Sequence, residues 1–184
     1  MIVPELLSVI EKINKGAVGV LPTDTVYGLV AAANQPAAIE RIYALKGRDA
    51  SKPFIILISD IRQLEMFDIA LRSLQIEKLA ELWKEPVSVI LPCNNNAFEY
   101  LHRGQRSLAF RIPQVHWLKV LLATTGPIVA TSANVSGQPI FRDINEISKQ
   151  LPGLDFYIEG PTSEEPSRLA RLHNDGSVKW LQRA

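Results

Sequence analysis

The sequence contains one cysteine and three histidines among its 184 residues. The single Cys93 cannot form a disulfide within the chain, so packing must hold the fold together. His102, His116 and His173 lie far apart and lack the spacing of a zinc-binding motif. We therefore expect no structural metal and no cysteine nucleophile, and we interpret these four side chains as packing or surface groups.

Long apolar runs are absent as well. No stretch approaches the roughly 20 apolar residues that a membrane span requires. The N-terminal segment lacks the positive lead-in of a secretory signal and instead has the apolar spacing of an amphipathic helix that ends at Gly16. We expect a soluble, cytoplasmic protein that does not contact a membrane.

Glycine-rich phosphate loops and an excess of one charge are also missing. Neither G-x-x-x-x-G-K-[ST] nor G-x-G-x-x-G occurs, so any bound phosphate must be held in another way. With 20 Lys and Arg against 19 Asp and Glu, the net charge of +1 excludes a strongly basic nucleic-acid-binding domain but permits a local basic patch. The residues that could form such a patch are Arg103, Arg106 and Arg111, or Lys46, Arg48 and Lys52.

Apolar residues make up 47% of the chain, which is enough to bury a core, and we expect one domain over residues 1–184. Short apolar runs bounded by Gly or Pro alternate with segments of helical period. The strands expected from this pattern are 17–21, 54–58, 87–91, 107–112, 128–131, 156–159, 168–172 and 178–181. Helices are expected at 35–45, 61–67, 71–83, 115–123 and 143–149. The alternation predicts a twisted α/β sheet, and antiparallel pairing of the last two strands would make it mixed.

Polar side chains adjoin three of the predicted strands. Hydroxyls and one acid follow the first strand, two cations precede the second, and a serine and an amide follow the strand at 128–131. These residues are, in chain order, Thr23, Asp24, Thr25, Lys46, Arg48, Ser132 and Asn134. Because ligands collect at strand ends in open α/β sheets, the three loops could face a single anion.

Each loop also has an ordinary structural explanation. Ser, Thr and Asp favour caps, cations at a helix C-terminus complement the helix dipole, and a Ser-x-Asn triplet can simply form a turn. Only the joint occurrence favours a ligand, because together the loops supply the donors that a triphosphate needs when no glycine loop is present.

The motifs PTDTVYGL, KGRDASKP, LAFRIP, TSANVSG and PS follow one another over nearly the whole chain. This ordered set resembles the YrdC family of threonylcarbamoyl-AMP synthases, in its short, TsaC-type bacterial form without an extra C-terminal domain. The resemblance implies a strongly twisted mixed α/β sheet around an open, positively lined cavity. It also implies a nucleotidyltransferase that joins L-threonine, bicarbonate and ATP, the last with Mg²⁺, into threonylcarbamoyl-AMP and pyrophosphate. A downstream tRNA threonylcarbamoyl transferase complex would then use the adenylate to form N6-threonylcarbamoyladenosine.

Site residues are carried over motif by motif. Thr25, Arg111 and Ser167 match positions that contact threonine. Lys46, Arg48, Ser132 and Asn134 match the catalytic residues that hold the nucleotide phosphates and the carbamate. Lys52, Ser107 and Arg183 match further nucleotide-binding positions, and no residue is expected to bind a metal.

The sequence departs from the family at the turn that usually reads W-P-G-P-x-T. Here Trp83 is followed by Lys84 and Glu85, so glutamate replaces the glycine, and the turn is expected to differ because only glycine adopts some turn geometries. Two other functions stay open. One is that of a non-catalytic RNA-binding or ribosome-assembly protein, and the other is carbamoyl transfer to a different acceptor. Weak RNA binding is also possible beside the catalytic function.

Overall fold

Short apolar segments pair into one nine-stranded sheet in the computed structural model, which describes residues 3–182. The strands are β1 (Gly19–Leu21), β2 (Gly28–Ala32), β3 (Ile55–Leu57), β4 (Val87–Pro92), β5 (Ser107–Arg111), β6 (Ile128–Ser132), β7 (Phe156–Tyr157), β8 (Arg168–Leu172) and β9 (Val178–Leu181). Their order across the sheet is β7-β1-β2-β6-β3-β5-β4-β8-β9. Three neighbouring pairs are parallel, β1 with β7, β3 with β5 and β4 with β8, and the others are antiparallel. The predicted mixed α/β sheet is therefore confirmed, including the antiparallel hairpin of β8 and β9.

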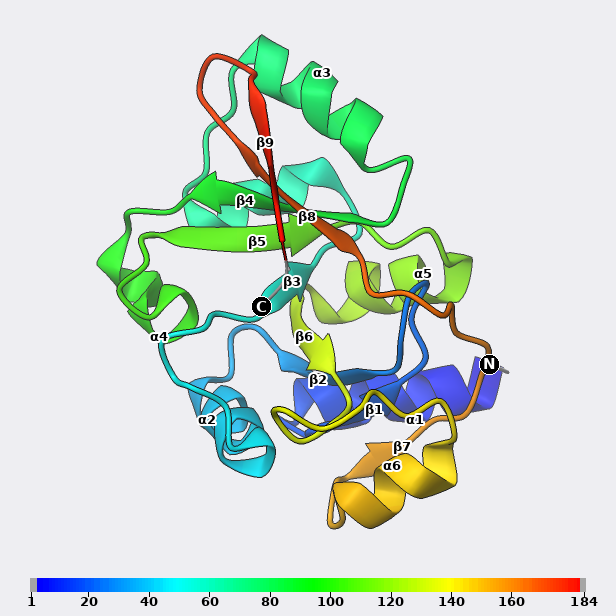
Figure 1. Ribbon diagram of the computed structural model, residues 1–184. Helices are drawn as coiled ribbons and strands as arrows, with labels where there is room; N and C mark the ends of the chain where they lie inside the picture. Colours follow the sequence, from blue (N-terminus) through cyan, green and yellow to red (C-terminus); the bar gives the residue numbers. More distant parts are fainter. Residues whose placement is uncertain (1–2, 183–184) are drawn as a thin grey trace.

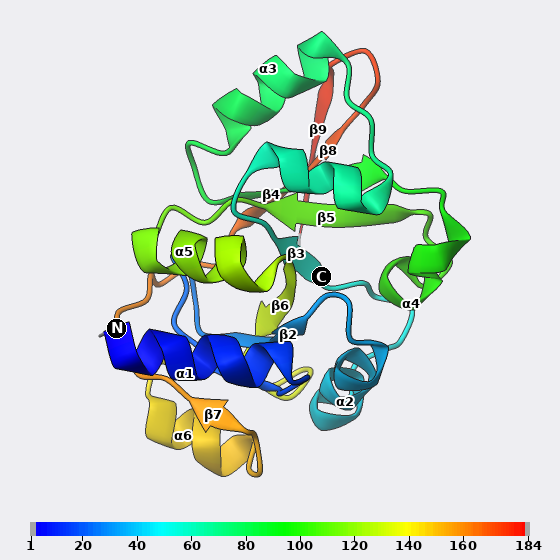
Figure 2. The same ribbon diagram turned by 180° about the vertical axis from the view of Figure 1, so that it is seen from behind.

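Helices cover the sheet unevenly. The α-helices are α1 (Val3–Asn14), α2 (Pro36–Lys46), α3 (Ser73–Leu82), α4 (Glu99–His102), α5 (His116–Thr125) and α6 (Ile144–Gln150), with 3-10 helices η1 (Ile61–Phe67) and η2 (Asn96–Phe98). Figure 2 shows α1, α5 and η1 lying over the same side of the sheet. Figure 1 shows β8 and β9 beside β4 at one end, and β7 with α6 at the other.

Two apolar clusters hold these layers together. In the smaller one, Ile13 of α1 and Leu121 of α5 are fully buried against strand residues such as Leu57 and Ile128. In the larger one, Ile42 of α2 packs with residues of η1, α3 and the central strands. Burying such side chains is worth roughly 1.5–3 kcal/mol each before entropy is counted, so the clusters fix where the loops between strands emerge. Among residues 3–182, the structure contains no helix long and apolar enough to cross a membrane.

One strand was not anticipated. The sequence pattern predicts no strand at residues 28–32, yet they form β2, whose five residues are all buried between β1 and β6. Gly and Ala have weak strand propensity, so the pairing partners on both sides, rather than local preference, decide this segment.

A predicted helix also differs in kind. Residues 61–67 form a 3-10 helix rather than an α-helix, beginning where the Asp60 side chain accepts a hydrogen bond from the Arg62 amide. It ends at Asp68, which has a left-handed backbone with φ of 55°. Caps at both ends therefore limit it to a short, tight helix.

Candidate functional site

The end of α2 places the first two predicted site residues. Lys46 is the last residue of the helix, and Gly47 follows in a left-handed conformation with φ of 55°. The amides of Gly47 and Arg48 donate to the carbonyls of Ala44 and Tyr43 at 3.2 and 3.1 Å, which is the hydrogen-bond pattern of a glycine C-cap. Gly47 thus ends the helix and turns the chain between Lys46 and Arg48.

Lys46 meets two of the other predicted residues directly. Its ammonium donates to the Ser132 carbonyl at 2.6 Å, to the Asn134 carbonyl at 2.5 Å and to Asn134 Oδ1 at 3.2 Å. The Ser132 hydroxyl in turn donates to Asn134 Oδ1 at 2.7 Å. The structure therefore brings Lys46, Ser132 and Asn134 into one hydrogen-bonded cluster, which we call the lysine cluster.

Burial makes the charge on Lys46 costly. Its side chain is 2% exposed, and removal from water lowers its pKa from 10.5 to about 7, with repulsion from Arg48 as a smaller cause. Among the ion pairs within residues 3–182, none gives Lys46 a carboxylate partner. A buried cation without a carboxylate favours binding of an anion, which would supply the missing countercharge.

Arg48 lies beside this cluster but bonds to a different segment. Its Nε donates to the Lys52 carbonyl at 3.0 Å and its Nη2 to the Pro53 carbonyl at 3.3 Å. The side chain of Lys52 is exposed, and Ser107 is half-buried at the start of β5. The remaining predicted nucleotide contact, Arg183, lies outside the described residues.

A second cluster forms around the predicted threonine contacts. Arg111, at the end of β5, is 4% exposed, and its Nη1 donates to the Thr25 hydroxyl at 2.9 Å. Nη1 also lies 3.2 Å from Asp24 Oδ1, and this is the ion pair of Arg111. Burial lowers the pKa of the Arg111 guanidinium, and the Asp24 charge opposes that shift. Thr23 steadies the loop because its hydroxyl accepts from the Thr25 amide at 3.1 Å. We call Asp24, Thr25 and Arg111 the arginine cluster.

Ser167 lies two strands away from Arg111. It precedes β8 and is buried, and its hydroxyl oxygen is 2.8 Å from that of Ser88 on β4. The three predicted threonine contacts therefore come from the loop before β2, the end of β5 and the segment just before β8, with β4 between the last two.

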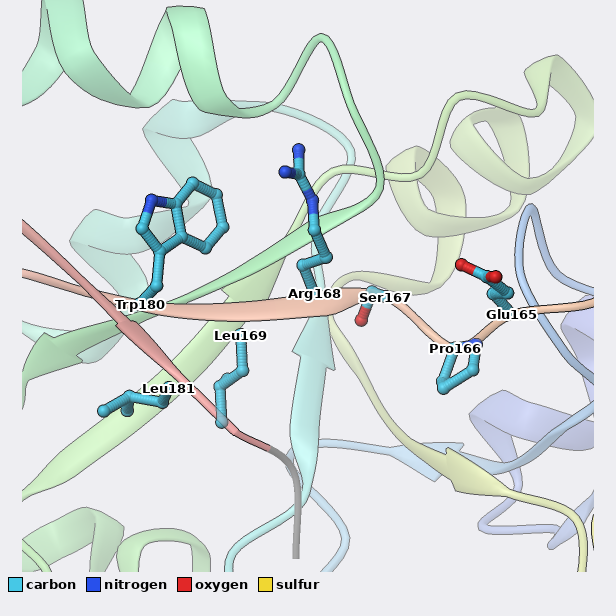
Figure 3. Close-up of a pocket in the computed structure, with 7 residues that line it drawn as sticks. All are labelled: Glu165, Pro166, Ser167, Arg168, Leu169, Trp180 and Leu181. Atoms are coloured by element: carbon cyan, nitrogen blue, oxygen red, sulfur yellow. The ribbon is translucent and has the colours of Figure 1, made fainter.

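An open cavity of about 530 Å³ adjoins Ser167. Figure 3 shows Ser167, Leu169 and Leu181 on one side of the β8–β9 hairpin, with Arg168 and Trp180 on the other. Arg168 stacks over the Trp180 ring, with its guanidinium carbon 4.7 Å from the ring centroid.

The loop between β1 and β2 connects the two clusters. Gly28 pairs with Ser132 across β2 and β6, and the Ala133 amide donates to the Tyr27 carbonyl at 2.9 Å. The same loop carries Thr25, three residues before Gly28. Figure 1 shows this blue loop rising away from β1, and its Thr25 accepts the hydrogen bond from Arg111 at the end of β5. The two clusters are therefore joined by one short loop and two neighbouring strands.

Sequence reasoning overlooked two residues of this arrangement. Asp24 was grouped with the polar strand-end residues but was given no role of its own, although it is the sole acid in the PTDT motif and adjoins Thr25, a predicted threonine contact. Ser88 was not singled out, because its contact with Ser167 depends on the pairing of β4 with β8.

The glutamate that replaces the family's glycine is accommodated. Glu85 is exposed and does not belong to the residues with positive φ among those described. The turn is closed by a hydrogen bond from the Glu85 amide to the Leu82 carbonyl at 3.2 Å. No left-handed conformation is required here, so the expected penalty for a residue other than glycine does not apply.

Comparisons with known proteins give a consistent result. The family model Sua5_yciO_yrdC, described as "Telomere recombination", matches residues 11–184. A threonylcarbamoyl-AMP synthase of Photobacterium profundum is 30% identical over 176 residues, covering 92% of this chain and 95% of the relative. One from Chromohalobacter salexigens is 37% identical over 128 residues, covering 69% of each chain.

Solved structures agree on the fold. The crystal structure of Pyrococcus abyssi Sua5 complexed with L-threonine superposes with a TM-score of 0.82 at 28% identity, over 91% of this chain and 51% of that one. Escherichia coli YciO gives a TM-score of 0.84 over 97% of this chain and 88% of that chain, and at 21% identity it supports the fold alone.

Proposed function

We infer, from the premise that the chain belongs to the Sua5/YciO/YrdC family, that this protein is a threonylcarbamoyl-AMP synthase. Its substrates would be L-threonine, bicarbonate and ATP, and its products threonylcarbamoyl-AMP and pyrophosphate. The observation that carries the proposal is the buried Lys46 ammonium, which Ser132 and Asn134 hold and which pairs with no carboxylate in the described part of the chain. Such a cation is suited to a polyanionic nucleotide.

The reaction explains the demand for positive charge. The threonine amine and bicarbonate first form a carbamate with loss of water, and a carbamate oxygen then attacks the α-phosphorus of ATP. An oxygen–phosphorus bond forms, and the bond between the α-phosphorus and the pyrophosphate oxygen breaks. Lys46 and Arg48 reduce the repulsion between the two anions and stabilise the charge that develops on pyrophosphate. No side-chain nucleophile takes part, so positioning and electrostatics carry the catalysis.

The arginine cluster would bind the amino acid. Arg111 offers a guanidinium to the threonine carboxylate, and Thr25 supplies a hydroxyl beside it. Asp24 partly balances the Arg111 charge while the site holds no amino acid. Ser167, which precedes β8, would contact the same substrate from two strands away.

Magnesium belongs to the proposal as the counter-ion of ATP. Within residues 3–182, no group of three or more His, Cys, Asp or Glu side chains is suited to hold a metal. The donor set therefore fits an ion held by triphosphate oxygens, as Mg²⁺ commonly is, rather than one held by a protein cage. Lys52, Ser107 and Arg183 complete the proposed nucleotide contacts. A downstream tRNA threonylcarbamoyl transferase complex would consume the product, which implies a cytoplasmic protein.

Pyrophosphate release tests this proposal. Release is expected only when ATP, Mg²⁺, L-threonine and bicarbonate are all present. Lys46→Ala and Asn134→Ala should lower the rate by about 10²–10³, the typical loss for one preorganised donor. Lys84→Ala, which removes an exposed lysine, is the control. Unchanged release in both folded site variants would reject the assigned site.

The alternative function is separated in the same experiment. A non-catalytic RNA-binding protein would release no pyrophosphate but would bind RNA with an affinity that falls steeply as salt is raised. The near-neutral net charge of +1 argues against that outcome.

A further inference from the structure

A stack of four side chains leads from the surface to Arg48. The Arg103 guanidinium carbon lies 4.3 Å from the centroid of the Tyr43 ring. The ring centroids of Tyr43 and Phe54 are 4.2 Å apart with planes inclined by 30°, and the Arg48 guanidinium carbon is 5.4 Å from the Phe54 centroid. Two cations therefore enclose two aromatic rings, an arrangement in which each cation is attracted to the face of the ring beside it.

A shared backbone carbonyl ties the same residues together. The Lys52 carbonyl accepts from Arg48 Nε at 3.0 Å and from the Tyr43 hydroxyl at 3.1 Å. Arg48 Nη2 donates to the Pro53 carbonyl at 3.3 Å. Within residues 3–182, Nη1 makes no hydrogen bond, so it is the part of the guanidinium left for a phosphate oxygen.

One helix carries the supporting residues in register with Lys46. Glu40, Tyr43 and Lys46 follow one another at intervals of three along α2, a spacing that puts neighbours on the same side of a helix. Glu40 forms an ion pair with Arg103 at 2.5 Å, which fixes the outer cation of the stack. The helix thus positions Lys46 directly and can position Arg48 through Tyr43.

We propose that Tyr43 is a positioning residue for Arg48, held from its outer side by Arg103, and that it sets the geometry with which Arg48 meets the nucleotide phosphates. The proposal rests on the proposed function of the same site. Arg48 follows the helix end on a short loop, and an arginine side chain loses considerable rotamer entropy when it is fixed. Fixing Nε through the Lys52 carbonyl removes part of that freedom before the nucleotide arrives.

Tyr43→Phe tests this role because it keeps the ring stack and removes the phenol hydroxyl, and with it the bond to the Lys52 carbonyl. Losing one such bond should weaken the contribution of Arg48 to ATP binding by roughly 3–10-fold. We expect the Kd for ATP, measured by calorimetry, and the KM for ATP to rise by that factor while the KM for L-threonine stays unchanged. Tyr100→Phe is the matched control, since it also removes a phenol bond to a backbone carbonyl, that of Ala33 at 3.0 Å.

A double-mutant cycle separates positioning from general stabilisation. In an Arg48→Gln background, Tyr43→Phe should have no further effect on ATP affinity, because it acts through the missing guanidinium. Full additivity, or equal changes in Tyr43→Phe and Tyr100→Phe, would overturn the proposal. If the wild-type protein neither bound ATP nor released pyrophosphate, the proposed function itself would fail, and that result differs from a loss of coupling in an active enzyme.

Discussion

Replacing Lys46 with methionine should change how stability depends on pH. Methionine keeps the length and apolar stem of the side chain but removes the titrating group. In the folded protein, burial lowers the pKa of Lys46 from 10.5 to about 7. In the unfolded chain the amine returns to its ordinary value. Between the two values, the unfolded state therefore binds more protons than the folded state.

The sign and size follow from this difference. Because the folded-state pKa lies below the unfolded one, the free energy of unfolding rises with pH across the window from about 7 to 10.5, at up to about 1.4 kcal/mol per pH unit. Between about pH 7.5 and pH 9, Lys46 should add about 2 kcal/mol to the wild-type stability. Lys46→Met lacks this increment. As the pH is raised over that interval, the free energy of unfolding of the wild type should therefore increase by about 2 kcal/mol relative to that of the variant.

Urea unfolding at the two pH values measures the effect. Subtracting the variant from the wild type cancels the contribution of every other titrating group to the pH dependence. Lys84→Met, which removes an exposed lysine, should give a profile parallel to the wild type. Parallel profiles for Lys46→Met as well would refute the reasoning. They would mean that the three oxygen acceptors around the amine keep it charged despite burial.

Three further predictions concern the surroundings of the site. Asp24→Asn should lower stability by roughly 1–3 kcal/mol, because it leaves the buried Arg111 without its carboxylate. It should also lower the KM for L-threonine, since the substrate carboxylate would then supply the missing countercharge, and an unchanged KM would contradict this. Gly19→Ala should lower the free energy of unfolding, measured in urea, by roughly 1–3 kcal/mol, since the added Cβ would overlap the Phe156 ring. Phe156→Leu in the same variant should restore part of that stability. Glu85→Gly should leave pyrophosphate release unchanged and lower the free energy of unfolding by about 0.4–1 kcal/mol, because glycine gives the unfolded chain more conformational entropy. A clear gain in activity would show that the glutamate impairs the site.

The sequence predicts most of the sheet because its strands carry their own signals. Residues 87–91 and 107–112 are apolar, rich in residues that favour strands, and bounded by turn residues, so local pattern and tertiary pairing agree. The segment at 28–32 lacks that agreement. Its glycine and alanines become a strand only because β1 and β6 flank it, and pairing of this kind depends on the order of strands in space.

The same distinction applies to the site. The loops at Lys46 and Ser132 could be proposed as neighbours because both adjoin strand ends, and the structure joins them by hydrogen bonds. The contact of Ser88 with Ser167 could not be proposed, since it requires β4 to lie beside β8. The hydrogen bonds of Arg48 to carbonyls of its own loop were equally out of reach, because they depend on the path of six residues after the helix.

The burial of Lys46 links stability to ligand binding. An uncompensated cation inside the protein weakens the folded state at and below neutral pH, so its presence is unfavourable for folding alone. In the proposed function, a bound triphosphate would supply the countercharge and raise the pKa of the amine again, so binding near pH 7 should take up a proton. That proton uptake would appear as a dependence of the calorimetric binding enthalpy on the ionisation enthalpy of the buffer. It should vanish in Lys46→Met even if Arg48 still holds some nucleotide, and its persistence there would place the titrating group elsewhere in the site.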